Sequence, residues 1–129
     1  MGFVTNDRFG FTIGYSPDAL VGDDGAVECK SRSQKYQVQT IVEGNVPAEY
    51  MIQLQTALLV SERKWIDFIS YSGGLPMLVI RCHPDAVVQA AIVAAAKNFE
   101  DTLGKHLATY QVASRDLIPT VRKIHQEMI

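Results

Sequence analysis

The sequence contains little of what several protein classes require. Its only cysteines, Cys29 and Cys82, are too few for the disulfide framework of a small secreted domain. No other metal-binding side chains stand at short spacing around them, so no structural zinc site is predicted. Every apolar run is shorter than the roughly 20 residues that span a bilayer, and the first residues do not resemble a secretory signal. We therefore expect a cytoplasmic protein with reduced cysteines and no membrane partner.

Net charge is also small, because 12 Lys and Arg stand against 14 Asp and Glu, which gives −2. Overall charge thus gives no support for nucleic-acid binding. Hydrophobic residues make up 47% and charged residues 20%, the balance of a globular protein rather than of a disordered, collagen-like or coiled-coil chain. The length of 129 residues predicts a single domain over residues 1–129.

Hydrophobic periodicity and turn residues divide the chain into alternating blocks of strand and helix. The predicted strands cover residues 9–14, 19–21, 26–30, 65–71 and 77–82. The predicted helices cover residues 34–42, 47–62 and 84–110. A last amphipathic segment, also predicted to be helical, follows up to residue 129 and carries the apolar residues Leu117, Val121, Ile124 and Met128. This order predicts an α/β fold with a mixed β-sheet flanked by α-helices.

Two apolar patterns are predicted to be packed. Trp65 and Tyr71 share one face of a strand and are expected in the core rather than in a platform that stacks on bases. The long helix carries an apolar stripe, and its alanines at 90, 91, 94, 95 and 96 suit close packing against another helix, in the core or at a subunit contact. The stripe consists of Val88, Ile92, Ala95, Phe99, Leu103, Leu107 and Tyr110.

Three charged side chains around the first hairpin form the main candidate site. Asp18 follows a strand, and Glu28 and Lys30 lie on one face of the returning strand, because strand side chains alternate. A tight Asp-Gly turn between them can bring Asp18 close to Glu28. Two carboxylates that converge are costly unless they are neutralised, and a hard divalent cation with oxygen ligands does so. The carbonyl of Cys29 is a further candidate ligand.

Such a set suits phosphodiester hydrolysis, in which a metal activates water and stabilises charge on the phosphate and the leaving oxygen. Lys30 would orient or deprotonate the water, or offset charge on the phosphate. A solvated surface hairpin explains the same residues, because Glu-x-Lys alone is common. The nine residues between Pro17-Asp18 and Glu28, bounded by strand patterns, favour the nuclease interpretation without removing the other.

Residues 16–30 resemble the catalytic segment of the phage lambda exonuclease and YqaJ-type viral recombinase nucleases, of the PD-(D/E)xK superfamily. The Tyr-x-x-Gln-x-Gln of residues 50–55 and the strand at 65–71 resemble the segments that follow in that family, so that the resemblance covers residues 2–103. It implies a restriction-endonuclease-like core. It also implies a 5′→3′ exonuclease that acts on double-stranded DNA during recombination.

The resemblance also implies roles for individual residues. Asp18, Glu28 and the Cys29 carbonyl would hold Mg²⁺, for which Mn²⁺ can substitute, and Lys30 would be the catalytic lysine. Gln53 would position the lysine, the water or the substrate. Gln55 is its rival, although it points about 200° away from Gln53 around the helix. A plain helix-surface role for Gln53 stays open.

Further expectations rest on the family alone. They are a toroidal homotrimer, a single-strand annealing protein as partner, and a phage or prophage gene expressed in the bacterial cytoplasm. The chain has Ser31-Arg32 where the family usually has Cys-Pro. It begins almost at the segment before the hairpin, so we expect a fragment, one piece of a split gene, or a minimal relative. Two alternatives stay open: a structure-specific or endonucleolytic nuclease, and a non-catalytic remnant that binds metal or a partner. The basic residues Arg32, Lys35, Arg63 and Lys64 suit the DNA backbone or solvated helix ends equally well.

Overall fold

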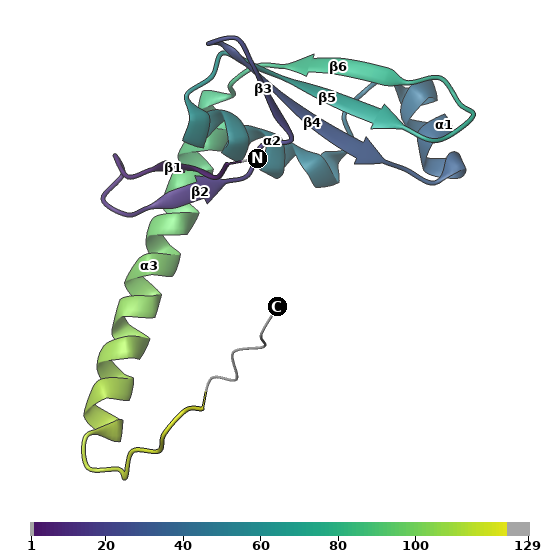
Figure 1. The fold of residues 1–129 in the computed structure, drawn as a ribbon. Helices are drawn as coiled ribbons and strands as arrows, with labels where there is room; N and C mark the ends of the chain where they lie inside the picture. The colour runs from purple at the N-terminus through teal and green to yellow at the C-terminus, as the bar shows by residue number, and fades with distance from the viewer. Residues whose placement is uncertain (1, 124–129) are drawn as a thin grey trace. The chain divides into compact units, whose positions relative to one another are not determined.

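The computed structural model describes residues 2–123. They form two compact units, one that ends at Lys97 and one that begins at Asn98. Helix α3 (Ala86–Ser114) contributes to both (Figure 1). The single domain expected over residues 1–129 stays a prediction.

The first unit is built on a four-stranded sheet. Its strands are β3 (Ala19–Val21), β4 (Gly25–Ser31), β5 (Trp65–Tyr71) and β6 (Leu78–Cys82), hydrogen-bonded in that order. The pair β4–β5 is parallel, and the pairs β3–β4 and β5–β6 are antiparallel. The predicted mixed sheet is thus confirmed. The predicted and observed bounds agree for the strand at 65–71 and differ by one residue for the strand that ends at Cys82.

Two helices connect β4 to β5, as a parallel pair requires. They are α1 (Gln34–Glu43) and α2 (Ala48–Ser61), close to the predicted 34–42 and 47–62. Leu54 and Leu58 of α2 are almost fully buried together with Ile66 and Phe68 of β5. Burying a side chain of this size contributes about 1.5–3 kcal/mol to the free energy of folding. The contact between α2 and the sheet is therefore the main core of this unit.

The face of β5 that packs on α2 corrects one prediction. Ile66, Phe68 and Ser70 are buried, whereas Trp65 is half-buried and Tyr71 is 43% exposed. The predicted core position of Trp65 and Tyr71 is therefore wrong. Both faces of this strand carry large apolar residues, and alternation alone does not say which of the two meets a helix.

A two-stranded ribbon, β1 (Val4–Asn6) paired with β2 (Ile13–Tyr15), precedes the sheet. The strand predicted over residues 9–14 is correct only at its end. The chain turns before it, where Gly10 has a φ of 88° and the Arg8 N–H donates to the side chain of Asn6. An alternating pattern does not report such a turn, because glycine in it counts as one more small residue.

Helix α3 starts where the carboxylate of Asp85 accepts the N–H groups of Val87 and Val88, at 3.0 and 3.1 Å. None of its residues is buried among those described, and Phe99 is 64% exposed. Core packing, one of the two predicted roles of this helix, is therefore wrong, because periodicity reveals an apolar face and not its partner. A subunit contact stays a prediction.

The amphipathic segment that was predicted to continue as a helix is not one between Ile118 and residue 123. Pro119 lacks the N–H that a helix needs and disfavours helical geometry at the residue before it. Residues 124–129, which include two of its apolar positions, lie outside the described part of the chain. Over residues 2–123, no helix combines the length and the apolar character needed to cross a bilayer.

Candidate active site

The β3–β4 hairpin brings the two predicted carboxylates together. Asp18 immediately precedes β3, and the register pairs the next residue, Ala19, with Val27. The Cys29 N–H donates to Oδ2 of Asp18 at 2.8 Å. This bond fixes an exposed carboxylate beside β4, next to Glu28. Asp18 is thus held at the residue next to Glu28, and a shared metal site of the two carboxylates stays a prediction.

Glu28 is the most heavily engaged side chain of the site. It is 5% exposed. Its Oε1 accepts a hydrogen bond from Nε2 of Gln53 at 3.0 Å and lies 3.3 Å from Nζ of Lys30. Its Oε2 accepts a longer hydrogen bond, of 3.4 Å, from the hydroxyl of Tyr15. Four elements therefore meet at one buried carboxylate: β2, β4, α2 and, through Asp18, the start of β3.

The electrostatics of this cluster show an excess of negative charge. Burial, and secondarily the charge of Asp18, raise the pKa of Glu28, while Lys30 and Tyr15 act in the opposite direction. Burial and the same two carboxylates raise the pKa of the Tyr15 hydroxyl well above its usual value. Both the burial of Glu28 and the second carboxylate thus disfavour its ionised form, and a bound cation would favour it.

The donor set agrees with a magnesium-like ion. In the described chain, no group of three or more His, Cys, Asp or Glu side chains is placed to hold a metal. The site supplies two carboxylates, of Asp18 and Glu28, and a nearby backbone carbonyl at Cys29. Mg²⁺ is commonly bound by one or two carboxylates and keeps several waters, whereas zinc sites need more protein ligands, usually with nitrogen or sulfur. The residues present therefore fit a hard divalent cation.

The two glutamines of the α2 motif have separate environments. Gln53 is exposed and reaches Glu28. Gln55 is 2% exposed. It donates to the carbonyl of His83 at 3.0 Å and accepts the N–H of Asp85 at 2.9 Å. Gln55 thereby holds the link between β6 and α3, and it is Gln53 that the structure brings to the carboxylates.

Two tyrosines of the site were not assigned a role from the sequence. Tyr15 donates to Glu28, and the ring of Tyr50 lies under Lys30, whose Nζ is 5.1 Å from the ring centroid. Their positions in the sequence could have indicated that they belong to the site. Tyr15 lies three residues before Asp18 at the end of a strand, and Tyr50 shares a helix face with Gln53.

Among the basic candidates, Arg63 and Lys64 brace the hairpin turn. Arg63 donates to the carbonyls of Gly22 and Gly25, at 2.6 and 3.3 Å, and Lys64 pairs with Asp24 at 3.3 Å. These contacts hold the turn that sets the β3–β4 register. They give both residues a structural role that the sequence interpretation did not include.

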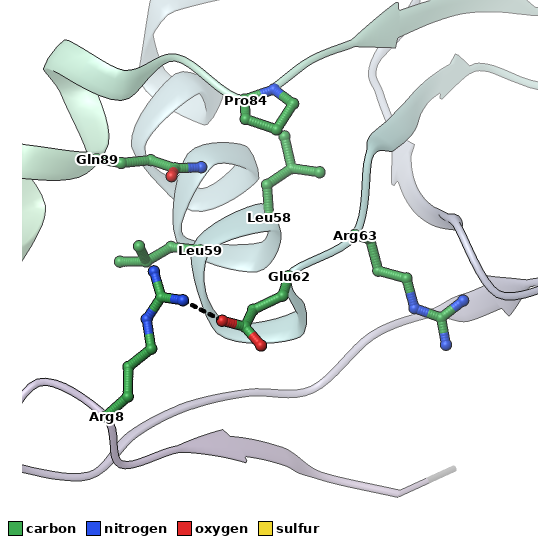
Figure 2. Close-up of a pocket in the computed structure, with 7 residues that line it drawn as sticks. All are labelled: Arg8, Leu58, Leu59, Glu62, Arg63, Pro84 and Gln89. Atoms are coloured by element: carbon green, nitrogen blue, oxygen red, sulfur yellow. Dashed lines mark hydrogen bonds and ion pairs between the residues drawn. The ribbon is translucent and has the colours of Figure 1, made fainter.

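A separate pocket lies at the C-terminal end of α2 and contains none of the carboxylates of the site (Figure 2). An ion pair between Arg8 and Glu62 lies along it, while the guanidinium of Arg63 points away from it. Its lining consists of Arg8, Leu58, Leu59, Glu62, Arg63, Pro84 and Gln89. It has neither paired carboxylates nor a free nucleophile, so it is not a catalytic candidate.

Comparison with known proteins agrees with this geometry. Residues 3–64 match the model of the YqaJ-like viral recombinase domain. The crystal structure of an alkaline exonuclease (LHK-Exo) from Laribacter hongkongensis matches with a TM-score of 0.81 and 30% sequence identity, over 92% of this chain and 62% of that one. The structure of LHK-Exo in complex with dAMP gives the same values. No curated protein matches.

The chain thus spans less than two thirds of the length of the exonuclease that it resembles. The family match, over residues 3–64, includes the β3–β4 hairpin with Glu28 and Lys30, and Asp18 just before it. The resemblance to the YqaJ-type viral recombinase nucleases that the motifs predicted is confirmed: residues 3–64 fit a YqaJ-like viral recombinase domain, and the chain has the fold of an alkaline exonuclease.

Proposed function

We propose that this protein is a metal-dependent deoxyribonuclease that hydrolyses phosphodiester bonds of double-stranded DNA, as a 5′→3′ exonuclease of the phage recombination type. The observation that carries the proposal is the buried carboxylate of Glu28, held by Gln53, Tyr15 and Lys30 beside a second carboxylate at Asp18. Similarity to an alkaline exonuclease, one of whose structures contains dAMP, supports a DNA substrate.

The proposed ligands of the metal are the carboxylates of Asp18 and Glu28 and the carbonyl of Cys29. When bound, Mg²⁺, or Mn²⁺ in its place, supplies an activated water near neutral pH and charge stabilisation on the phosphate. The chain orients this set. The Cys29 N–H holds one oxygen of Asp18, and Gln53 fixes Oε1 of Glu28. Both carboxylates thus keep their positions as the phosphate approaches, and little reorganisation is needed.

Lys30 is the proposed catalytic lysine. Its ammonium is 3.3 Å from Glu28 and lies over the ring of Tyr50, with 24% of its side chain exposed. It is therefore fixed and still accessible to a substrate. In that position it can hold the attacking water or donate to an oxygen of the phosphate as negative charge develops. Gln53 would act through Glu28, as a positioning residue.

The wider setting is proposed from the family resemblance. It includes a homotrimer, a single-strand annealing protein as partner, and action in the cytoplasm of a bacterial host from a phage or prophage gene. This setting is independent of the argument for the site.

Degradation of linear duplex DNA tests the proposal. Duplexes labelled at the 5′ or 3′ end and a closed circular duplex are incubated with the protein in Mg²⁺, in Mn²⁺ and in EDTA. We expect metal-dependent release of nucleotides from the 5′ end of linear DNA and no cleavage of the circle. Cleavage of the circle would identify an endonuclease at the same site. The absence of degradation under all conditions would overturn the proposal.

A further inference from the structure

Arg32 is a buried cation close to the proposed site. It follows directly after β4, where its N–H donates to the carbonyl of Tyr71 at 2.8 Å. Only 8% of its side chain is exposed. The guanidinium lies between two aromatic rings, with Cζ 5.6 Å from the centroid of Tyr36 and 5.2 Å from that of Tyr50. This side chain is therefore held in one place by packing.

The charge of this guanidinium is poorly compensated. Nη1 is buried and has no hydrogen-bond partner among residues 2–123. Nη2 lies 3.7 Å from Oε1 of Glu49, too far for a hydrogen bond. The Glu49 side chain is 65% exposed and free to move into solvent. A buried guanidinium is normally paired and hydrogen-bonded, because an uncompensated one is costly. Arg32 therefore lacks the acceptors that its burial calls for.

The surroundings of Arg32 suit an anion. Arg32, Tyr36, Glu49 and Tyr50 line a pocket of about 270 Å³, which we call the Arg32 pocket. Tyr36 is in the first turn of α1 and Tyr50 in that of α2, and neither helix has a side-chain cap hydrogen bond. The N–H groups and the dipole at a helix N-terminus attract negative groups. Glu49 is the one anion in this lining.

The Arg32 pocket adjoins the proposed catalytic centre. Lys30 and Arg32 both lie against the ring of Tyr50, at 5.1 and 5.2 Å from its centroid. If a phosphate is cleaved beside Lys30, the neighbouring phosphates of that strand come next along the same surface, because each strand carries one charge per about 3.4 Å of helix axis.

We propose that the Arg32 pocket binds a phosphodiester group of the DNA strand, next to the phosphate that is cleaved. The inference rests on the proposed function. The phosphate takes the place of the Glu49 carboxylate, which turns into solvent, and phosphate oxygens become the acceptors of the Arg32 guanidinium. Glu49 thus competes with DNA for Arg32, and Arg32 is a substrate-positioning residue.

This proposal and a purely structural role of the ion pair predict opposite effects of Glu49→Gln. If Glu49 serves to compensate Arg32, its neutralisation removes a favourable contact and leaves DNA binding unchanged or weaker. If Glu49 competes with phosphate, neutralisation strengthens DNA binding. The side chain is exposed, so the substitution does not disturb the core and the protein remains folded.

The experiment measures equilibrium binding of a fluorescent duplex by anisotropy in EDTA, where no cleavage occurs, over a series of NaCl concentrations. The proteins are the wild type, Glu49→Gln, Arg32→Gln and, as a matched arginine outside the pocket, Arg81→Gln. Each is tested with duplexes that carry a 5′-phosphate or a 5′-hydroxyl.

We expect Glu49→Gln to bind about two- to fivefold more tightly. Arg32→Gln should bind about tenfold more weakly, and its plot of log affinity against log salt should be less steep by about 0.9. Arg81→Gln should bind as the wild type does. Both types of 5′ end should give the same result.

Weaker or unchanged DNA binding by Glu49→Gln would overturn the proposal that the Arg32 pocket binds a phosphodiester group, even if Arg32→Gln fails to fold. A loss in Arg32→Gln that is confined to 5′-phosphorylated DNA would also overturn it, since it would assign the pocket to a strand end. If the wild type degrades DNA and both variants bind normally, only the pocket is refuted. If the wild type neither binds nor degrades DNA, the proposed function is refuted with it.

Discussion

Two clusters of acidic and basic side chains lie on the same sheet and differ in how they are balanced. On β5 and β6, Arg81 donates to both oxygens of Asp67, at 2.8 and 3.1 Å. Its guanidinium also stacks on Trp65, with Cζ 3.7 Å from the ring centroid. One acid meets one base in the bidentate geometry that satisfies both. This cluster leaves no charge for a ligand.

The cluster on β4 is not closed in this way. Glu28 pairs with a single ammonium, that of Lys30, and burial together with the nearby charge of Asp18 still raises the pKa of Glu28. Glu28 is buried among hydrogen-bond donors, whereas the carboxylate of Asp18 is exposed beside it. A complete ion pair on a strand is thus a structural feature, whereas negative charge in excess, held in place by hydrogen-bond donors, is a candidate binding site.

The largest expected effect is a difference in the rate of DNA degradation between variants of the two carboxylates Glu28 and Asp67. Glu28→Gln should reduce the rate of duplex degradation at least about 100-fold, because it removes a metal ligand and a charge from the reaction centre. Asp67→Asn should leave the rate close to that of the wild type. Initial rates on end-labelled DNA in Mg²⁺, with circular dichroism of both variants as a folding control, test this. Equal losses in the two variants would refute the distinction between the clusters.

A second comparison uses the two glutamines of α2. Gln53→Ala should lower the rate about 10- to 100-fold, as the loss of a residue that orients a metal ligand does, without a change in the urea midpoint. Gln55→Ala should lower the free energy of unfolding by about 1–3 kcal/mol, since it leaves the buried partners of Gln55 unsatisfied, while the rate of the folded fraction is kept. If instead Gln55→Ala lost the rate and Gln53→Ala lost the stability, Gln55 would be the residue of the site.

The raised pKa of Glu28, caused by burial and then by the charge of Asp18, also predicts a dependence of stability on pH when metal is removed. Because the pKa of Glu28 is raised in the folded state, the folded protein retains a proton that the unfolded chain has lost. In EDTA, the free energy of unfolding should therefore fall as pH rises from the ordinary carboxyl pKa through the raised one. The Glu28→Gln variant lacks this titration, so the wild type should lose stability relative to it over that range.

Urea denaturation of the two proteins at several pH values, with EDTA or with Mg²⁺, measures this difference. With Mg²⁺, the wild type should be more stable than Glu28→Gln near neutral pH, because the ion stabilises only the folded state to which it binds. A difference that is independent of pH in EDTA would show that Glu28 carries no unfavourable charge in the fold.

The smallest effect is expected at the closed pair. Arg81→Gln should change the midpoint of thermal unfolding only slightly, since the Arg81 side chain is 52% exposed and exposed pairs are screened by solvent. The rate of DNA degradation should not change. A marked loss of activity with a normal midpoint would give this cluster a functional role that its geometry does not suggest.

The sequence predicted the site better than its surroundings, for physical reasons. Asp18, Glu28 and Lys30 converge through one hairpin, whose strand period and turn residues are local signals. Helical geometry alone places Gln53 and Gln55 on different faces of α2, so that only one of them can reach the carboxylates. The hydrogen bond from Tyr15 depends on how the β1–β2 ribbon lies beside β4, which no local pattern encodes.

The same limit applies to packing. The bounds of β5 follow from its neighbouring turns, but its buried face follows from contact with α2, and the Trp65 face proved to be the outer one. The apolar stripe of α3, which includes Phe99, indicated a helix face correctly and gave no information about a partner. Structure is thus predicted correctly from the sequence where it depends on hydrophobic period and turn residues. It is not predicted where it depends on tertiary contacts.

Binding of Mn²⁺, measured by isothermal titration calorimetry, tests most directly the claim that the hairpin carboxylates form a metal site. The proteins are the wild type, Asp18→Asn and, as a matched control, Asp67→Asn. We predict one binding event in the wild type and in Asp67→Asn, and its loss or strong weakening in Asp18→Asn. Absence of binding in the wild type, or equal binding by all three proteins, would contradict it.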